Sequence, residues 1–142
     1  MNDEKENLEI KAGNSGRFLG IDYGTKRVGT ALTDQERQMA FPDEVLTNDS
    51  HLIEKIQNKI KKENITKVII GESKNYKMED NAIMSDIIDL KDVIEKTMEI
   101  DVVLEPEFMS SMQAEKIQGK NDMIDASAAA IVLQSYLDKR KK

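Results

Sequence analysis

Apolar and polar residues alternate in the first third of the chain in a way that is typical of β-strands. Residues 18–23, 27–34 and 41–46 each form a short apolar or alternating run, and we predict a strand at each. Only three residues separate the first two runs, which is short enough for an antiparallel hairpin. Pro42 predicts that the third strand lies at an edge, because proline offers no backbone donor to a second neighbour.

Helical spacing replaces this alternation from residue 48 onward. The segment Asn48-Asp49-Ser50 is typical of a helix cap. Two apolar stripes at helical spacing follow, namely Leu52, Ile53, Ile56 and Ile60 in the first and Ile83, Ile87, Leu90 and Ile94 in the second. Continuous apolar runs at 67–71 and 101–104 predict buried strands of a parallel sheet. A capping pattern at 110–113 predicts a short helix that ends near residue 119, and a last helix covers about 122–138.

This order of elements predicts an α/β fold with a mixed five-stranded sheet. Three antiparallel strands come first and two parallel strands follow, with helices on both faces of the sheet. At 142 residues the chain is most simply one domain. We place that domain at 17–138, after a disordered, highly charged tail at 1–16 and before a basic tail at 139–142.

The charge of the chain limits how it can bind a polyanion. The formal net charge is −6, which argues against a protein that coats nucleic acid by bulk attraction. The first 16 residues carry −2 and the last four carry +4, which leaves −8 on the residues between them. Such a protein must hold phosphates locally, through a few cations or through metal ions that bridge carboxylate and phosphate.

Cysteine and histidine content narrows the chemistry further. The chain has no cysteine and one histidine, so disulfides are excluded, and a zinc site of the usual ligands or a serine–histidine triad fits poorly. A bound metal would be a hard cation held by oxygen atoms. The lack of cysteine makes a reducing cytoplasm the expected setting. No apolar run approaches the ~18 residues that a membrane helix needs, so we expect no membrane partner.

Three carboxylates stand at the ends of predicted elements. Asp22 ends the first strand, Glu107 follows the last strand with Glu105 beside it, and Asp125 lies in the first turn of the last helix. Each also has a structural explanation. Asp22 could accept hydrogen bonds from turn amides, the glutamates could be solvated, and Asp125 could complement a helix N-terminus.

Together these carboxylates favour a metal site. The ends of adjacent parallel strands are where open α/β sheets build their sites. Three carboxylates gathered there would repel one another unless divalent cations neutralised them. Two Mg²⁺ ions about 4 Å apart can hold such a cluster and act on both oxygens of a phosphodiester displacement.

Four segments of the chain form a recognisable set of motifs, namely DYGTKRVGTALTD at 22–34, VIIG at 68–71, EPEFMSSMQA at 105–114 and DMIDASAAAIVLQSYL at 122–137. Together they resemble the YqgF/RuvX family, whose members are described as pre-16S rRNA nucleases and as Holliday-junction-resolvase-like proteins. The resemblance covers roughly residues 17–138, and its first and last motifs are specific in combination.

The resemblance implies a ribonuclease-H-like fold and a nuclease that hydrolyses phosphodiester bonds in processing the 5′ end of precursor 16S rRNA. It implies that Asp22, Glu107 and Asp125 are the catalytic acids and hold Mg²⁺ or Mn²⁺, with two ions expected. Gly24 would allow close approach of the substrate, and Lys26 and Arg27 would lie near its phosphates.

The chain departs from the family pattern at two places. Phe108 replaces an arginine beside Glu107, which removes a cation able to hold phosphate with two hydrogen bonds. Glu72-Ser73 replaces a Leu-Pro pair after Gly71, which adds a negative charge. We expect these departures to affect catalytic efficiency and the choice of substrate, and not the fold.

Alternative functions follow from the same residues. A nucleotide-dependent phosphotransferase shares the Asp-x-Gly-Thr hairpin, but the chain has no second glycine-rich hairpin to enclose a nucleotide. A binding module that kept the fold without its chemistry is favoured by Phe108 and the acidic body. The expected partner is nucleic acid, structured RNA or branched DNA, since such sites address backbone phosphates more than bases. The sequence is compatible with a monomer or a weak dimer.

Overall fold

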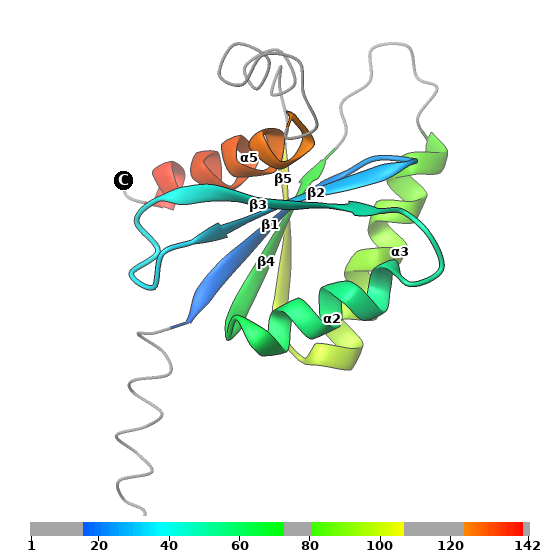
Figure 1. Ribbon diagram of the computed structural model, residues 1–142, viewed down its shortest axis with the longest axis horizontal. Coiled ribbons are helices and arrows are strands. Elements are labelled where there is room, and N and C mark those ends of the chain that lie inside the picture. Colours follow the sequence, from blue (N-terminus) through cyan, green and yellow to red (C-terminus); the bar gives the residue numbers. More distant parts are fainter. Residues whose placement is uncertain (1–15, 73–80, 107–123, 141–142) are drawn as a thin grey trace, which may run out of the picture.

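Five strands and three helices make up the part of the chain that the structure describes. The structure, a computed structural model, describes residues 16–72, 81–106 and 124–140 (Figure 1). The strands are β1 (Arg17–Tyr23), β2 (Arg27–Thr33), β3 (Ala40–Thr47), β4 (Ile65–Glu72) and β5 (Asp101–Pro106), and the helices are α2 (Leu52–Lys62), α3 (Asn81–Met98) and α5 (Ile124–Arg140). The short helix predicted from residue 110 lies outside the described residues.

One sheet joins all five strands in the order β3-β2-β1-β4-β5. The first three strands pair antiparallel, and β1, β4 and β5 pair parallel, so the predicted mixed sheet is confirmed. β3 lies at one edge, as Pro42 predicted. β1 is the central strand, and its carboxyl end therefore has neighbours on both sides.

Helices cover both faces of this sheet, and each face has its own apolar core (Figure 1). The larger core joins α2 and α3 to the sheet through the two predicted stripes, and Ile56, Ile87 and Ile94 are fully buried in it. The smaller core lies under α5, where Phe18, Ala129 and Leu133 pack together. None of the helices in the described part of the chain combines the length and the apolar composition that spanning a membrane requires.

Close packing of α5 on β1 depends on a glycine. A Cβ atom at Gly20 would lie 2.8 Å from Cβ of Leu133 and 3.0 Å from the carbonyl oxygen of Ala129, closer than side chains approach one another. The run of small residues at 126–130, four alanines and Ser127, gives the helix a correspondingly thin face. The small residues at the end of the chain thus serve close packing of a helix on a sheet.

A β-bulge in β3 brings two carboxylates to one lysine. Ala31 pairs with Pro42 and Thr30 with Glu44, so Asp43 is an extra residue in β3. Because of this extra residue, Asp43 and Glu44 both reach Lys59 of α2, with Nζ of Lys59 2.6 Å from Oδ2 of Asp43. Burial disfavours the charged ammonium, but the hydrogen bonds and charges of the two carboxylates outweigh it and raise the pKa of Lys59 above its usual 10.5.

An ion pair between a buried glutamate and an exposed lysine ties α5 to β5. Glu105 is only 3% exposed, and its Oε2 atom accepts a hydrogen bond from Ser135 Oγ at 3.0 Å and lies 2.7 Å from Nζ of Lys139. Lys139 belongs to α5, which continues to Arg140 beyond the predicted end near residue 138. The charge of Lys139 therefore compensates a carboxylate within the fold.

Two details of the first predicted helix are wrong. The N-cap of α2 is His51, without a side-chain cap, since Asn48 bonds to the β1–β2 turn and Asp49 accepts the backbone N–H of His51. Ile53 is 37% exposed, because a residue one position after Leu52 is rotated about 100° around the helix. The buried stripe consists of Leu52, Ile56 and Ile60.

Replacing Lys59 tests the bulge contact. Lys59→Met should lower the free energy of unfolding by about 1–3 kcal/mol at pH 7, because the part-buried Asp43 and the half-exposed Glu44 lose their cation. The folded-state pKa of Lys59 is raised, so its contribution is complete below pH 10.5 and is lost as the pH rises through the folded value. Urea unfolding from pH 7 to 11 should therefore show the wild-type advantage shrinking at the alkaline end. Lys96→Met, at an exposed position of α3, is the control, and an equal loss from both variants would contradict the prediction.

A double-mutant cycle tests the contact between α5 and β5. Lys139→Met should cost about 1–3 kcal/mol of unfolding free energy, because Glu105 is left buried with a hydroxyl as its partner. Adding Glu105→Gln should recover most of that loss, since the uncompensated charge is then gone. Thermal or urea unfolding of the four proteins gives the coupling energy. Additive effects would show that the two side chains act independently.

Candidate active site

Asp22 stands at the carboxyl end of the central strand, as predicted. Successive side chains of a strand point to opposite faces, and Phe18 and Gly20 face α5. Asp22 lies an even number of residues from both and therefore has the same parity along the strand, so its carboxylate lies on the α5 face of the sheet. It is partly buried there.

Glycines flank Asp22 on this face. Gly29 of β2 is its register partner, and Gly71 of β4 comes one step after the pair formed by Ile21 and Ile70. The neighbouring residues Ala31 and Ile69 pack under α5, so the two glycines share the face of Asp22. The surface beside the carboxylate on both neighbouring strands is therefore bare backbone, which leaves room for a ligand of some size.

α5 begins on the Asp22 side of this face. Near its C-terminal end, Tyr136 contacts Phe18 with ring centroids 6.1 Å apart, whereas Ala129 and Leu133 lie over Gly20. Residue numbers in α5 thus fall as those of β1 rise toward Asp22. Asp125 falls in the first turn of α5, as the sequence predicted.

The β1–β2 turn carries the predicted substrate contacts and is held by Asn48. Nδ2 of Asn48 donates to the carbonyl oxygen of Gly24 at 2.7 Å, and its backbone N–H donates to the carbonyl oxygen of Lys26 at 2.9 Å. A Cβ atom at Gly24 would lie 2.6 Å from the carbonyl oxygen of Arg27, so the turn itself requires this glycine. Lys26 and Arg27 are exposed beside the end of β1.

Sequence reasoning missed the role of Asn48, because it explained that residue as part of a helix cap. A local signal did exist, since the side chains of Asn, Asp and Ser form hydrogen bonds to the backbone of a turn as readily as to a helix end. Choosing between the two required the pairing of β2 with β3, which places Thr47 opposite Arg27. That pairing brings Asn48 beside the turn.

The structure describes Glu105 but not Glu107. Glu105 pairs with Lys139 and Ser135, so its carboxylate is already engaged within the fold. Glu107 lies outside the described residues, as does Phe108. The part of the chain that the structure describes holds no group of three metal-ligating side chains, and Asp22 is the predicted ligand whose side chain it places.

Glu72 lies away from the candidate site. Val68 and Ile70 point into the core under α2 and α3, and Glu72 has the same parity. Its carboxylate therefore faces the side of the sheet opposite Asp22. The negative charge that this position adds relative to the family pattern does not fall beside Asp22.

Hard oxygen donors are the ligands that this end of the sheet offers. A carboxylate beside bare strand backbone, in a chain without cysteine, fits a hard divalent cation such as Mg²⁺. The exposed cations of the neighbouring turn suit an anionic substrate better than a metal. The arrangement can place a phosphate between a carboxylate-bound cation and a basic turn.

Relatives named as nucleases match almost the whole chain. A protein of Pelagibacter ubique (strain HTCC1062) named "Putative pre-16S rRNA nuclease" is 30% identical, over 94% of this chain and 95% of its own length. A protein of the same name from Sulfurihydrogenibium sp. (strain YO3AOP1) is 33% identical, over 87% of this chain and 90% of its own length.

Solved structures with the same fold include resolvases. RuvC of T. thermophilus in complex with a Holliday junction substrate superposes with a TM-score of 0.63 at 16% identity, covering 89% of this chain and 96% of that one. The Fowlpox virus resolvase with Holliday junction DNA superposes with a TM-score of 0.59 at 14% identity, covering 89% and 99%. These likenesses confirm the ribonuclease-H-like fold that the family resemblance implied.

The family model described as Holliday junction resolvase matches residues 16–139. This match takes in every strand and helix of the described structure except the last residue of α5. The chain belongs to the RuvX family.

Proposed function

We propose that this protein is a metal-dependent nuclease that hydrolyses phosphodiester bonds at the 5′ end of precursor 16S rRNA. The observation that carries the proposal is the carboxylate of Asp22 at the end of the central strand, flanked by glycines and beside the basic β1–β2 turn. The names of the relatives supply the substrate class.

The metal would be held by Asp22, Glu107 and Asp125, which are the family's acids carried over by position. When bound, Mg²⁺ or Mn²⁺ would lower the pKa of a water molecule and neutralise charge on the phosphate, and two ions would serve the attacking and leaving oxygens. The role of Asp22 is to anchor the cation on a rigid central strand, so that its position does not depend on loop motion.

Gly24, Lys26 and Arg27 would bind the substrate. The turn is short and tied to Asn48 at two points, so its backbone holds a defined position beside the end of β1. Exposed ammonium and guanidinium groups there would contact phosphates next to the scissile bond. In a protein of net charge −6, these local cations, together with bound metal ions, offset the repulsion of a polyanion.

A branched DNA substrate is the second candidate. The description of the family and the resolvase complexes with the same fold favour it. A site that contacts backbone phosphates does not by itself distinguish RNA from DNA. Both substrates therefore belong in one assay.

Replacing Asp22 tests the catalytic role. Asp22→Asn should reduce Mg²⁺-dependent cleavage of a precursor 16S rRNA fragment at least about a hundredfold, because one charged ligand is lost from the metal site. The melting temperature should stay unchanged or rise, since repulsion among the carboxylates is relieved. Gel assays on the RNA fragment and on a four-way DNA junction measure both candidate activities.

Asp101→Asn is the matched control. It removes the same charge at an exposed position at the amino end of β5, and cleavage should stay at the wild-type rate. Substantial cleavage by Asp22→Asn would refute the metal-site proposal. Cleavage of the junction but not of the RNA would assign the site to DNA.

A further inference from the structure

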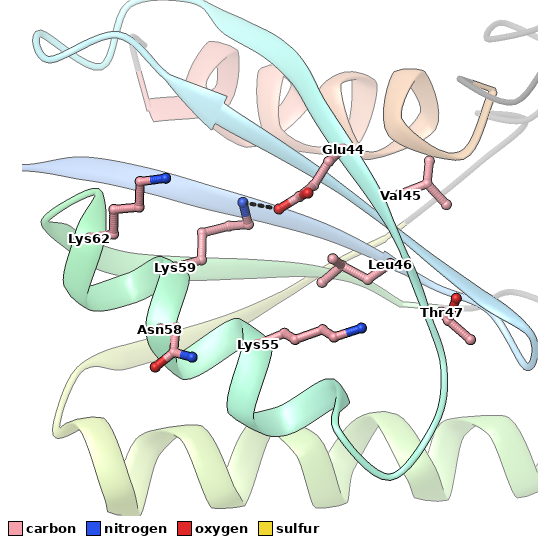
Figure 2. Close-up of a pocket in the computed structure, with 8 residues that line it drawn as sticks. All are labelled: Glu44, Val45, Leu46, Thr47, Lys55, Asn58, Lys59 and Lys62. Atoms are coloured by element: carbon pink, nitrogen blue, oxygen red, sulfur yellow. Dashed lines mark ion pairs between the residues drawn. The ribbon is translucent and has the colours of Figure 1, made fainter.

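A groove of about 460 Å³ runs between the edge strand β3 and helix α2, on the other side of the sheet from α5. Its strand wall is the segment 44–47, and its helix wall is a row of polar side chains from α2 (Figure 2). In Figure 2, the side chains of Lys55, Lys59 and Lys62 extend from α2 toward β3. The nucleic-acid site described above makes no use of this groove.

The three lysines form one line along the helix. They are four and three residues apart, which places them on a single face of α2. Lys59, in the middle, is mostly buried and is neutralised by Asp43 and Glu44. Lys55 and Lys62 are exposed, and no residue in the described part of the chain forms an ion pair with either.

The carboxylates of the groove are thus already paired, and two ammonium groups at its ends are available to a ligand. Lys62 lies seven positions after Lys55 on the helix, which is about 10 Å along the axis. Stacked nucleotides advance about 3.4 Å each along one strand, so the two lysines match phosphates about three nucleotides apart. Lysine suits such contacts, because its ammonium group sits on a flexible side chain and can donate hydrogen bonds to a phosphate from several directions.

One end of the groove lies beside the β1–β2 turn. Thr47, at one end of the strand wall, is the register partner of Arg27, and Asn48 holds the turn that contains Lys26. The segment after Asn48 leads directly into α2 and Lys55. Positive groups therefore follow one another from the β1–β2 turn past Lys55 to Lys62.

We propose that this groove binds the phosphate backbone of a single-stranded extension of the RNA substrate, leading away from the active site. An acidic polypeptide strand is a poorer occupant. The bulge at Asp43 and the proline beside it interrupt the regular edge that strand addition needs. The proposal rests on the proposed function for its class of ligand, and it adds a second, non-catalytic contact surface.

Salt-dependent binding tests the groove directly. The probe is a fluorescein-labelled RNA hairpin, with or without a single-stranded extension of about ten nucleotides, which exceeds the ~16 Å length of α2. Fluorescence anisotropy is measured in Asp22→Asn, so that the RNA stays intact. Adding Lys55→Gln and Lys62→Gln should weaken binding of the extended RNA and reduce the slope of log K against log salt by about 1.4–1.8. Binding of the RNA without extension should not change.

Lys61→Gln with Lys96→Gln is the matched control, because it removes the same charge from exposed positions outside the groove. This control should leave the slope for the extended RNA unchanged. The proposal would be overturned if the control reduced the salt slope equally, or if the lysine pair affected both RNAs equally. Either result would show that the total charge of the protein, and not the groove, controls binding. The proposal would also be overturned if the variant without Lys55 and Lys62 kept the salt slope for the extended RNA but bound polyglutamate more weakly. That result would assign the groove to an acidic polypeptide.

The two proposals can fail separately. If the lysine pair controls binding of the extended RNA but the wild-type protein cleaves neither RNA nor junction, the groove stands and the nuclease proposal fails. If the wild-type protein cleaves RNA and the slope is independent of Lys55 and Lys62, the nuclease stands and the groove proposal fails. If the extended RNA does not bind at all, the groove proposal is refuted.

Discussion

The contact between α5 and the backbone of β1 at Gly20 sets the position of the other parts of the candidate site. A side chain at this point would push the helix away from the sheet, and Ala129 and Leu133 could no longer lie over the strand. The helix runs opposite to β1, so the same contact brings its first turn toward Asp22. One missing Cβ atom thus determines how closely two acid-bearing elements approach each other.

Several of the described carboxylates are paired with lysines within the fold, which explains why counting acids cannot locate the site. Asp43 and Glu44 share Lys59 across the β3 bulge, and Glu105 is held by Lys139 and Ser135. Asp22 differs because it ends a central strand with glycines on both sides. Position within the sheet, more than charge, identifies a catalytic candidate in a chain with 27 acids.

Much of the fold could be predicted from local pattern, because strand alternation and helical spacing are recorded in consecutive residues. The strands, the order of antiparallel and parallel pairs, and the position of Asp22 all follow from such patterns. The roles of Asn48 and Lys139 could not be predicted, because each depends on a partner brought close by sheet pairing or helix docking. The bulge at Asp43 is equally non-local, since it exists only relative to the register of β2.

The double attachment of the β1–β2 turn to Asn48 links the turn to the start of α2. Asn48 lies four residues before Leu52, where that helix begins, and the N-cap residue His51 makes no side-chain capping hydrogen bond. Uncapped helix ends open more easily than helix centres, so opening here can travel back to the segment that holds the turn. The turn and the first residues of α2 would then exchange their amide hydrogens as one unit, distinct from the rigid strand that carries Asp22.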